Sequence, residues 1–236
     1  MSYESLQADE IIATVGRLKQ RIDDRFPDSG LGRVCDHLHG ISRQASERAR
    51  WIKQPIVRLR IGTWLLVAAL VVVIGYVVLW ILSQRADFNL PDAVQMVDAG
   101  TSTAIVVGGL LFFVISIERR IKRRRALHAI DELRSLAHII DMHQLTKDPE
   151  RLRTRWIITP SSPRQTMTAF ELDRYLDYCS EMLALTGKVA AVYAQAFDDD
   201  VALAAVNDVE DLTTGLARKI WQKIMVLHSF ETSARL

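Results

Sequence analysis

Two blocks of apolar residues dominate the hydrophobic pattern of the chain. The first block, 61–82, reads IGTWLLVAALVVVIGYVVLWIL and contains no charged residue. At about 1.5 Å per residue, a helix of this length reaches roughly 33 Å, which matches a hydrocarbon core of about 30 Å. Its aromatic residues lie toward its two ends, where such rings favour the headgroup boundary. We therefore predict a transmembrane helix over 55–83, with Pro55 in its first turn.

The second block, 100–117, reads GTSTAIVVGGLLFFVISI. It lies at the short end of the range of about 17 to 25 residues that crosses a bilayer, so a re-entrant or interfacial segment is the alternative. The basic residues beyond its C-terminal end favour a full span, which we place at 99–118. A short external loop over 84–98 would join the two spans into a helical hairpin.

Basic residues flank this hairpin only at its two outer ends, whereas the connecting stretch carries one arginine against three aspartates. We predict that the chain is a multi-pass protein of the plasma (inner) membrane. Because arginine and lysine accumulate on the cytoplasmic side of membrane proteins, we expect both of its termini to be cytoplasmic. The predicted anchors to topology or to lipid headgroups are Arg58, Arg60, Arg119, Arg120, Lys122, Arg123, Arg124 and Arg125. Their expected partner is a bilayer with an anionic inner leaflet.

The polar remainder of the chain has helical periodicity and no alternating strand pattern. We predict N-terminal cytoplasmic helices over 1–54, a cytoplasmic continuation of the second span over 119–146, a loop over 147–167 and C-terminal helices over 168–236. The first 26 residues lack the apolar core of a signal peptide, so we expect them to be retained. The predicted fold class is an all-α membrane protein, with a two-helix transmembrane hairpin and a cytoplasmic helical bundle formed by N- and C-terminal helices.

Three local patterns refine this prediction. The end of the second N-terminal helix reads RARWIKQP, which suits either contact with the anionic leaflet through Trp51 or packing on the C-terminal bundle. Thr168 followed by Glu171 is the pattern of a capping box, which predicts a helix start. The acidic triplet 198–200 favours a second helix start, and a divalent cation site is the alternative.

No sequence pattern indicates catalysis. Phosphate-binding glycine loops, CxxC, HExxH and GxSxG are all absent, so we expect neither an enzyme nor a cofactor. A net charge of +2 is too small to suggest nucleic acid as a partner. Histidines and aspartates also recur after the second apolar block, at His128, Asp131, His138, Asp141 and His143. Their spacing matches no recognised metal site, so we predict no metal site there, and metal binding by this series is the alternative. Cys35 and Cys179 are expected to be reduced thiols.

Small residues recur every fourth position in the second apolar block, at Gly100, Ala104 and Gly108. This spacing lets two helix backbones approach closely in lipid, either within the hairpin or between subunits. The order of two spans followed by cytosolic helices resembles that of the two-span effector modules of bacterial defence systems. We hypothesise a homo-oligomer that acts as a small channel or membrane effector. Its cytosolic domain would sense a signal or interact with a cytosolic protein partner. The alternative is a membrane-anchored scaffold or assembly factor without transport activity.

Overall fold

The computed structural model describes residues 6–83, 90–152, 160 and 166–233. Every regular element in these ranges is helical. The chain divides into two compact units, which are considered separately: a bundle unit, formed by Met1–Lys53 and Arg125–Leu236, and an apolar unit, formed by Gln54–Arg124. The described elements are α1 (Ala8–Arg25), α2 (Gly30–Lys53), α3 (Val57–Ser83), α4 (Leu90–Leu145), the short 3-10 helix η1 (Pro149–Leu152), α5 (Ala169–Ala196) and α6 (Asp200–Ser233).

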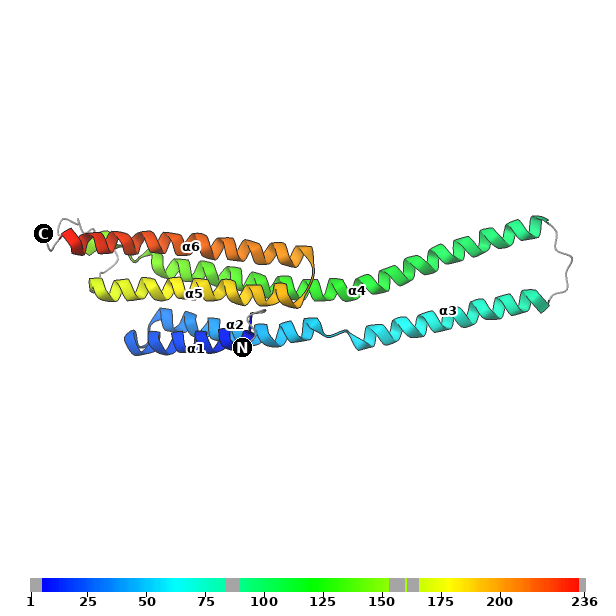
Figure 1. The fold of residues 1–236 in the computed structure, drawn as a ribbon, viewed down its shortest axis with the longest axis horizontal. Coiled ribbons are helices and arrows are strands. Elements are labelled where there is room, and N and C mark those ends of the chain that lie inside the picture. Colours follow the sequence, from blue (N-terminus) through cyan, green and yellow to red (C-terminus); the bar gives the residue numbers. More distant parts are fainter. Residues whose placement is uncertain (1–5, 84–89, 153–159, 161–165, 234–236) are drawn as a thin grey trace. The chain divides into compact units, whose positions relative to one another are not determined.

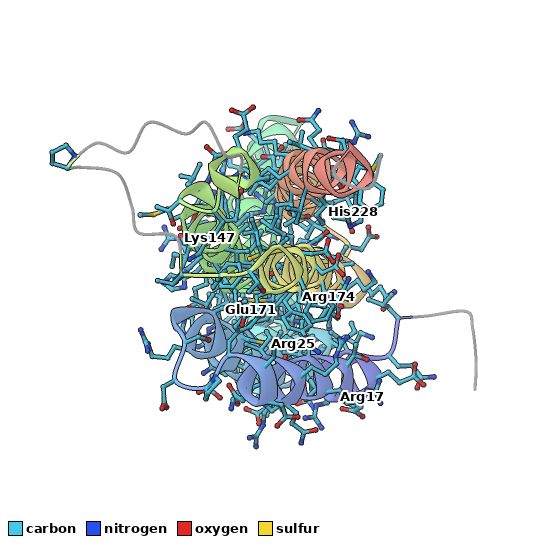
Figure 2. All side chains as sticks on the ribbon, turned by 90° about the vertical axis from the view of Figure 1, so that its left-hand side faces the viewer. Arg17, Arg25, Lys147, Glu171, Arg174 and His228 are labelled. Atoms are coloured by element: carbon cyan, nitrogen blue, oxygen red, sulfur yellow. The ribbon has the colours of Figure 1, made fainter. Side chains whose placement is uncertain are left out.

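The bundle unit is organised around α5, which contacts α1 and α2 on one side and α6 on the other (Figure 1). A view along the helix axes places α5 in the centre of this group (Figure 2). This position requires apolar residues around most of the helix. Fourteen residues of α5 are accordingly buried, among them Leu176, Cys179, Leu183 and Tyr193. The helical bundle predicted from the periodicity is thus present, with α5 as its central helix.

Local signals in the sequence fix where the helices of the bundle begin. Asp28 adopts a left-handed backbone conformation, with φ of 54°, in the turn that follows α1. The hydroxyl of Ser29 then accepts a hydrogen bond from the Gly32 amide, 3.0 Å away, at the start of α2. At α5, the predicted capping box between Thr168 and Glu171 is present in both directions.

The acidic triplet also marks a helix start. The Asp199 carboxylate accepts a hydrogen bond from the Ala202 amide at 3.2 Å, directly before the first turn of α6. Asp199 is buried, whereas its neighbours Asp198 and Asp200 are exposed. The helix-start interpretation therefore accounts for the one carboxylate of the triplet that is withdrawn from solvent.

The apolar unit contains two helical segments long and apolar enough to cross a membrane, Leu59–Trp80 in α3 and a segment that begins at Gly100 in α4. None of the residues in the most apolar window of either segment is buried within the structure. The structure places the start of α3 at Val57, two residues after Pro55. The Ile56 carbonyl accepts the first helical hydrogen bond, from the Arg60 amide, and the Ile56 amide donates to the Glu118 side chain. Ile56, rather than Pro55, therefore precedes the first turn.

Two predicted loops contain helical residues. The external loop predicted over 84–98 is too long, because α4 begins at Leu90; Pro91 and Asp92 fall in its first turn, where both residue types are favoured. The loop predicted over 147–167 contains η1, and most of its remaining positions lie outside the described residues.

We predict that Asp199→Ala lowers the free energy of unfolding of the bundle by about 1 kcal/mol, because it removes the side-chain acceptor at the start of α6. The matched control is Asp198→Ala, which removes an exposed carboxylate from the adjacent position and should change stability by less than about 0.5 kcal/mol. Thermal unfolding followed by circular dichroism measures both. Equal losses in the two variants would contradict the capping role of Asp199.

Candidate functional site

The predicted stripe of small residues is open in the structure. Gly100, Ala104 and Gly108 are all exposed on α4. A Cβ atom added to Gly100 or Gly108 would meet no other atom within 4 Å, leaving aside the neighbouring backbone. Among the described residues, the stripe is therefore not used for close packing against α3. Both uses of this spacing, within the hairpin and between subunits, rest on close helix contact, and the described part of the structure shows no such contact at Gly100 or Gly108.

The predicted basic anchors differ from one another in their surroundings. Four of them are exposed in the apolar unit: Arg60, Arg119, Arg120 and Arg124. Lys122, in contrast, is buried, and Arg123 is half-buried. The side chain of Arg58 lies outside the described residues. The basic run is therefore only partly a solvated surface.

Glu118 explains why Lys122 is buried. One oxygen of the Glu118 carboxylate lies 3.0 Å from the Lys122 ammonium and accepts a hydrogen bond from the Ile56 amide at 3.2 Å. The other oxygen lies 3.7 Å from Nε of Arg60. Glu118 and Lys122 belong to α4, whereas Ile56 and Arg60 lie at the start of α3. We call this arrangement the Glu118 clasp, since one carboxylate joins the two helices of the apolar unit.

The sequence carried a weak signal for this clasp. Glu118 is the acidic residue at the junction between the second apolar block and the basic run. A carboxylate with lysine four residues later is a favourable helical pair. The contact with Ile56 could not be predicted, because it joins positions 62 residues apart through a backbone amide.

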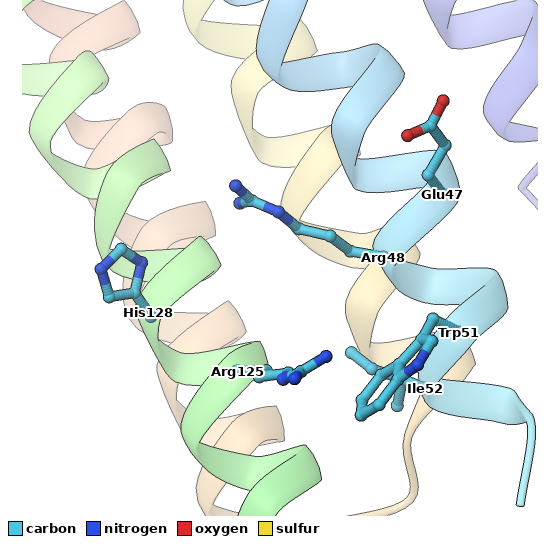
Figure 3. A pocket seen from close by; sticks show the side chains of 6 residues that line it. All are labelled: Glu47, Arg48, Trp51, Ile52, Arg125 and His128. Carbon is cyan, nitrogen blue, oxygen red and sulfur yellow. The ribbon is translucent and has the colours of Figure 1, made fainter. Parts of the chain in front are cut away.

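A second constellation lies within the bundle unit, between α2 and the part of α4 that begins at Arg125. The guanidinium of Arg125 lies over the ring of Trp51, 4.0 Å from the ring centre. Beside them is a pocket of about 610 Å³. Figure 3 shows the side chains that line it: Glu47, Arg48, Trp51, Ile52, Arg125 and His128. We call this the Trp51–Arg125 pocket.

The other basic groups of the pocket are held by one carboxylate. Arg48 donates to Glu132 at 2.7 Å, and the ring of His128 lies 3.3 Å from the other oxygen of the same carboxylate. The Glu132 carboxylate raises the pKa of Arg48 above its ordinary value, so this guanidinium stays charged. Tyr193 is buried in the bundle, and its hydroxyl lies close enough to Arg48 for the two groups to interact. Burial raises the pKa of Tyr193, which keeps the hydroxyl neutral.

Trp51 is half-buried and packs against the hydrophobic core of the bundle. Of the two interpretations of the RARWIKQP segment, the structure supports packing on the bundle, since α2 contacts both α1 and α5. The part of the Trp51 side chain that is not buried lines the pocket. Arg50 and Lys53 are exposed on the same helix but do not line this pocket.

The histidines and aspartates of α4 do not converge. His138 is exposed, Asp141 accepts a hydrogen bond from Gln144 at 2.6 Å, and His143 packs so closely on α2 that a Cβ at Gly30 would lie 2.7 Å from its ring. In the part of the chain that the structure describes, no three His, Cys, Asp or Glu side chains are close enough to hold a metal ion.

Both cysteines are buried in the bundle, and burial raises the pKa of Cys35 and of Cys179 to about 12.

No protein-family model matches the chain, and no curated protein or solved structure shows significant similarity to it. The two membrane-length helices and the geometry of the clasp and the pocket therefore carry the functional inference.

We predict that Glu118→Gln destabilises the protein by about 1–3 kcal/mol, because the Lys122 ammonium, with 11% of its side chain exposed, loses its counter-ion. The control is Arg119→Gln, which changes an exposed neighbouring side chain and should have an effect below about 0.5 kcal/mol. Thermal unfolding in detergent compares the two. A melting temperature of Glu118→Gln equal to that of the control would show that the clasp contributes nothing.

Proposed function

We propose that the chain is an integral membrane protein that crosses the bilayer twice, through α3 and through the N-terminal part of α4. The observation that carries this proposal is the exposure of its apolar side chains: Trp64 is 73% exposed, Leu79 69% and Phe112 74%. Leaving one such side chain in water rather than burying it costs roughly 1.5–3 kcal/mol. Six of them would offset the net stability of a typical domain, about 5–15 kcal/mol. A lipid environment removes this cost.

The distribution of charge gives the orientation. The basic residues flank the hairpin at its outer ends, so the bundle unit is cytoplasmic and the connection between α3 and α4 is external, in a plasma (inner) membrane. Within this arrangement the Glu118 clasp lies at the cytoplasmic border of the two spans. A charged group is less costly there than in the hydrocarbon region.

The role that we propose is that of a homo-oligomer whose cytosolic bundle senses or recruits a partner and whose hairpin responds, as a small channel or membrane effector. Two observations support it. The stripe at Gly100, Ala104 and Gly108 is open for another helix. In addition, α4 carries both the second apolar segment and residues of the bundle core, such as Leu133 and Ile140, on one helix.

The second candidate is a membrane-anchored scaffold without transport activity. It is favoured by the absence of charged residues from 61–82 and 100–117, because ion and proton paths usually place ionisable groups inside the membrane. Conductance of the purified protein in a planar bilayer separates the two candidates. An oligomer without ion flux would favour the scaffold. Neither candidate requires catalysis.

We predict that cysteines at two exposed positions, Ser83→Cys at the end of α3 and Asp98→Cys in α4 before the second apolar segment, react with a membrane-impermeant maleimide on intact cells. A cysteine at the exposed bundle position Glu210 should react only after permeabilisation. The native thiols give little background, because both are buried and their pKa values are raised to about 12. Labelling of the first two positions only after permeabilisation would refute the proposed orientation.

We predict that replacing Gly100, Ala104 and Gly108 together by leucine converts the oligomer into smaller species, because leucine side chains keep helix backbones apart. The matched control is Gly75→Leu on α3, where an added Cβ would also meet no atom within 4 Å. Light scattering of the detergent-solubilised protein gives the mass of each variant. An unchanged mass in the triple variant, or a monomeric parent protein, would exclude assembly through this stripe.

A further inference from the structure

Arg125 is held in an unusual position for an exposed arginine. Its guanidinium lies over the Trp51 ring at 4.0 Å, and none of the described residues forms an ion pair with it. A guanidinium that is stacked on an aromatic face keeps its N–H groups in the plane parallel to the ring, where they can still donate hydrogen bonds. The structure therefore presents a guanidinium on an aromatic ring, and the described residues supply no carboxylate partner for its positive charge.

The described carboxylates near the pocket do not neutralise the Arg125 guanidinium. Glu132, which lies two helical turns after Arg125 on α4, is engaged by Arg48 and His128. Glu47 lines the pocket, but Figure 3 shows its carboxyl group directed away from both guanidinium groups. Arg48 extends from α2 toward α4, so the donors of the pocket come from two helices. Because Arg48 already donates to Glu132 and Gln44, Arg125 is the principal donor that the pocket offers to an anion.

The position of the pocket along the chain indicates where such an anion would come from. Arg125 follows Glu118 by seven residues in the same helix, a rise of about 10 Å. Trp51 lies six residues before Val57, the first residue of α3. The headgroup layer extends roughly 5–7 Å beyond the hydrocarbon on each side. This step rests on the proposed spans: along the chain, Trp51 and Arg125 each lie within seven residues of one of them, which makes a lipid headgroup one source of the anion.

We propose that the Trp51–Arg125 pocket binds a phosphate monoester. Phosphate offers several oxygens to the planar fork of an arginine, and arginine is the side chain best suited to bind it in this way. A volume of about 610 Å³ admits a phosphate together with a glycerol or a sugar of a headgroup. The source is either the headgroup of an anionic lipid or a soluble phosphate ester, because the same group recognises both.

Native mass spectrometry of the full chain in an uncharged detergent, titrated with phosphatidic acid, tests the lipid source. Phosphatidylserine serves as an anionic lipid without a phosphate monoester. We expect phosphatidic acid to bind more tightly to the parent protein and about tenfold or more weakly to Arg125→Gln, which removes charge-assisted hydrogen bonds. Equal affinity for the two lipids would overturn the proposal, since it would show general attraction to negative charge.

Arg124→Gln is the matched control. It removes the same charge from the adjacent exposed position, which does not line the pocket. General attraction to an anionic surface predicts equal losses of less than about fivefold in both variants. Equal losses would therefore also overturn the proposal. Should Arg125→Gln lose its helical circular dichroism, Arg125→Lys decides, because it retains the charge but lacks the planar fork and should still bind about fivefold more weakly.

Calorimetric titration with glycerol 3-phosphate in the same detergent tests the soluble source. Binding that depends on Arg125, without binding of phosphatidic acid, would support the pocket and identify a soluble ligand. Failure of both ligands to bind would overturn it. Neither titration requires a bilayer or an orientation, whereas the cysteine labelling described above requires both. The proposed topology and the proposed ligand can therefore fail independently.

Discussion

The apolar surface of α3 and of the N-terminal part of α4 is the constraint on which the rest of the structure depends. Its side chains are exposed over the length of both candidate spans, and none of the described contacts within the chain covers them. In water this surface would cost more free energy than a typical domain has available. In lipid the same surface is favourable, and the intrahelical hydrogen bonds satisfy the backbone.

Charged residues are concentrated at the outer ends of the two apolar segments. At the beginning of α3 and the end of the second apolar segment, one carboxylate, Glu118, neutralises Lys122 and also reaches the Ile56 amide and Arg60. A single acidic side chain is sufficient because the neighbouring arginines Arg119, Arg120 and Arg124 remain in solvent. The clasp therefore joins the two helices at a place where a partly buried ion pair retains contact with water, which limits its desolvation cost.

The bundle unit obeys the ordinary rules of a soluble helical domain. Its core is continuous through α1, α2, α4, α5 and α6, and its polar contacts lie at the margins, as in the ion pair between Arg21 and Glu181. The Trp51–Arg125 pocket departs from these rules, because Arg125 lies there over a half-buried tryptophan and has no carboxylate partner within the described part of the chain. Such a departure from the local rules of packing is expected at a functional site.

The sequence by itself determined the helical class, the two membrane-length segments, and the helix starts at Thr168 and Asp199, because all of these depend on residues that are close in the chain. It misjudged the connection before α4, since Pro91 and Asp92 suit a first helical turn as well as a loop. Tertiary structure decided the rest. Trp51 and Arg125 are separated by 74 positions, and the Glu118 clasp depends on a backbone amide that no side-chain pattern marks. Contacts of this kind arise only when helices pack, and hydrophobic periodicity specifies which face is buried but not which residue it meets.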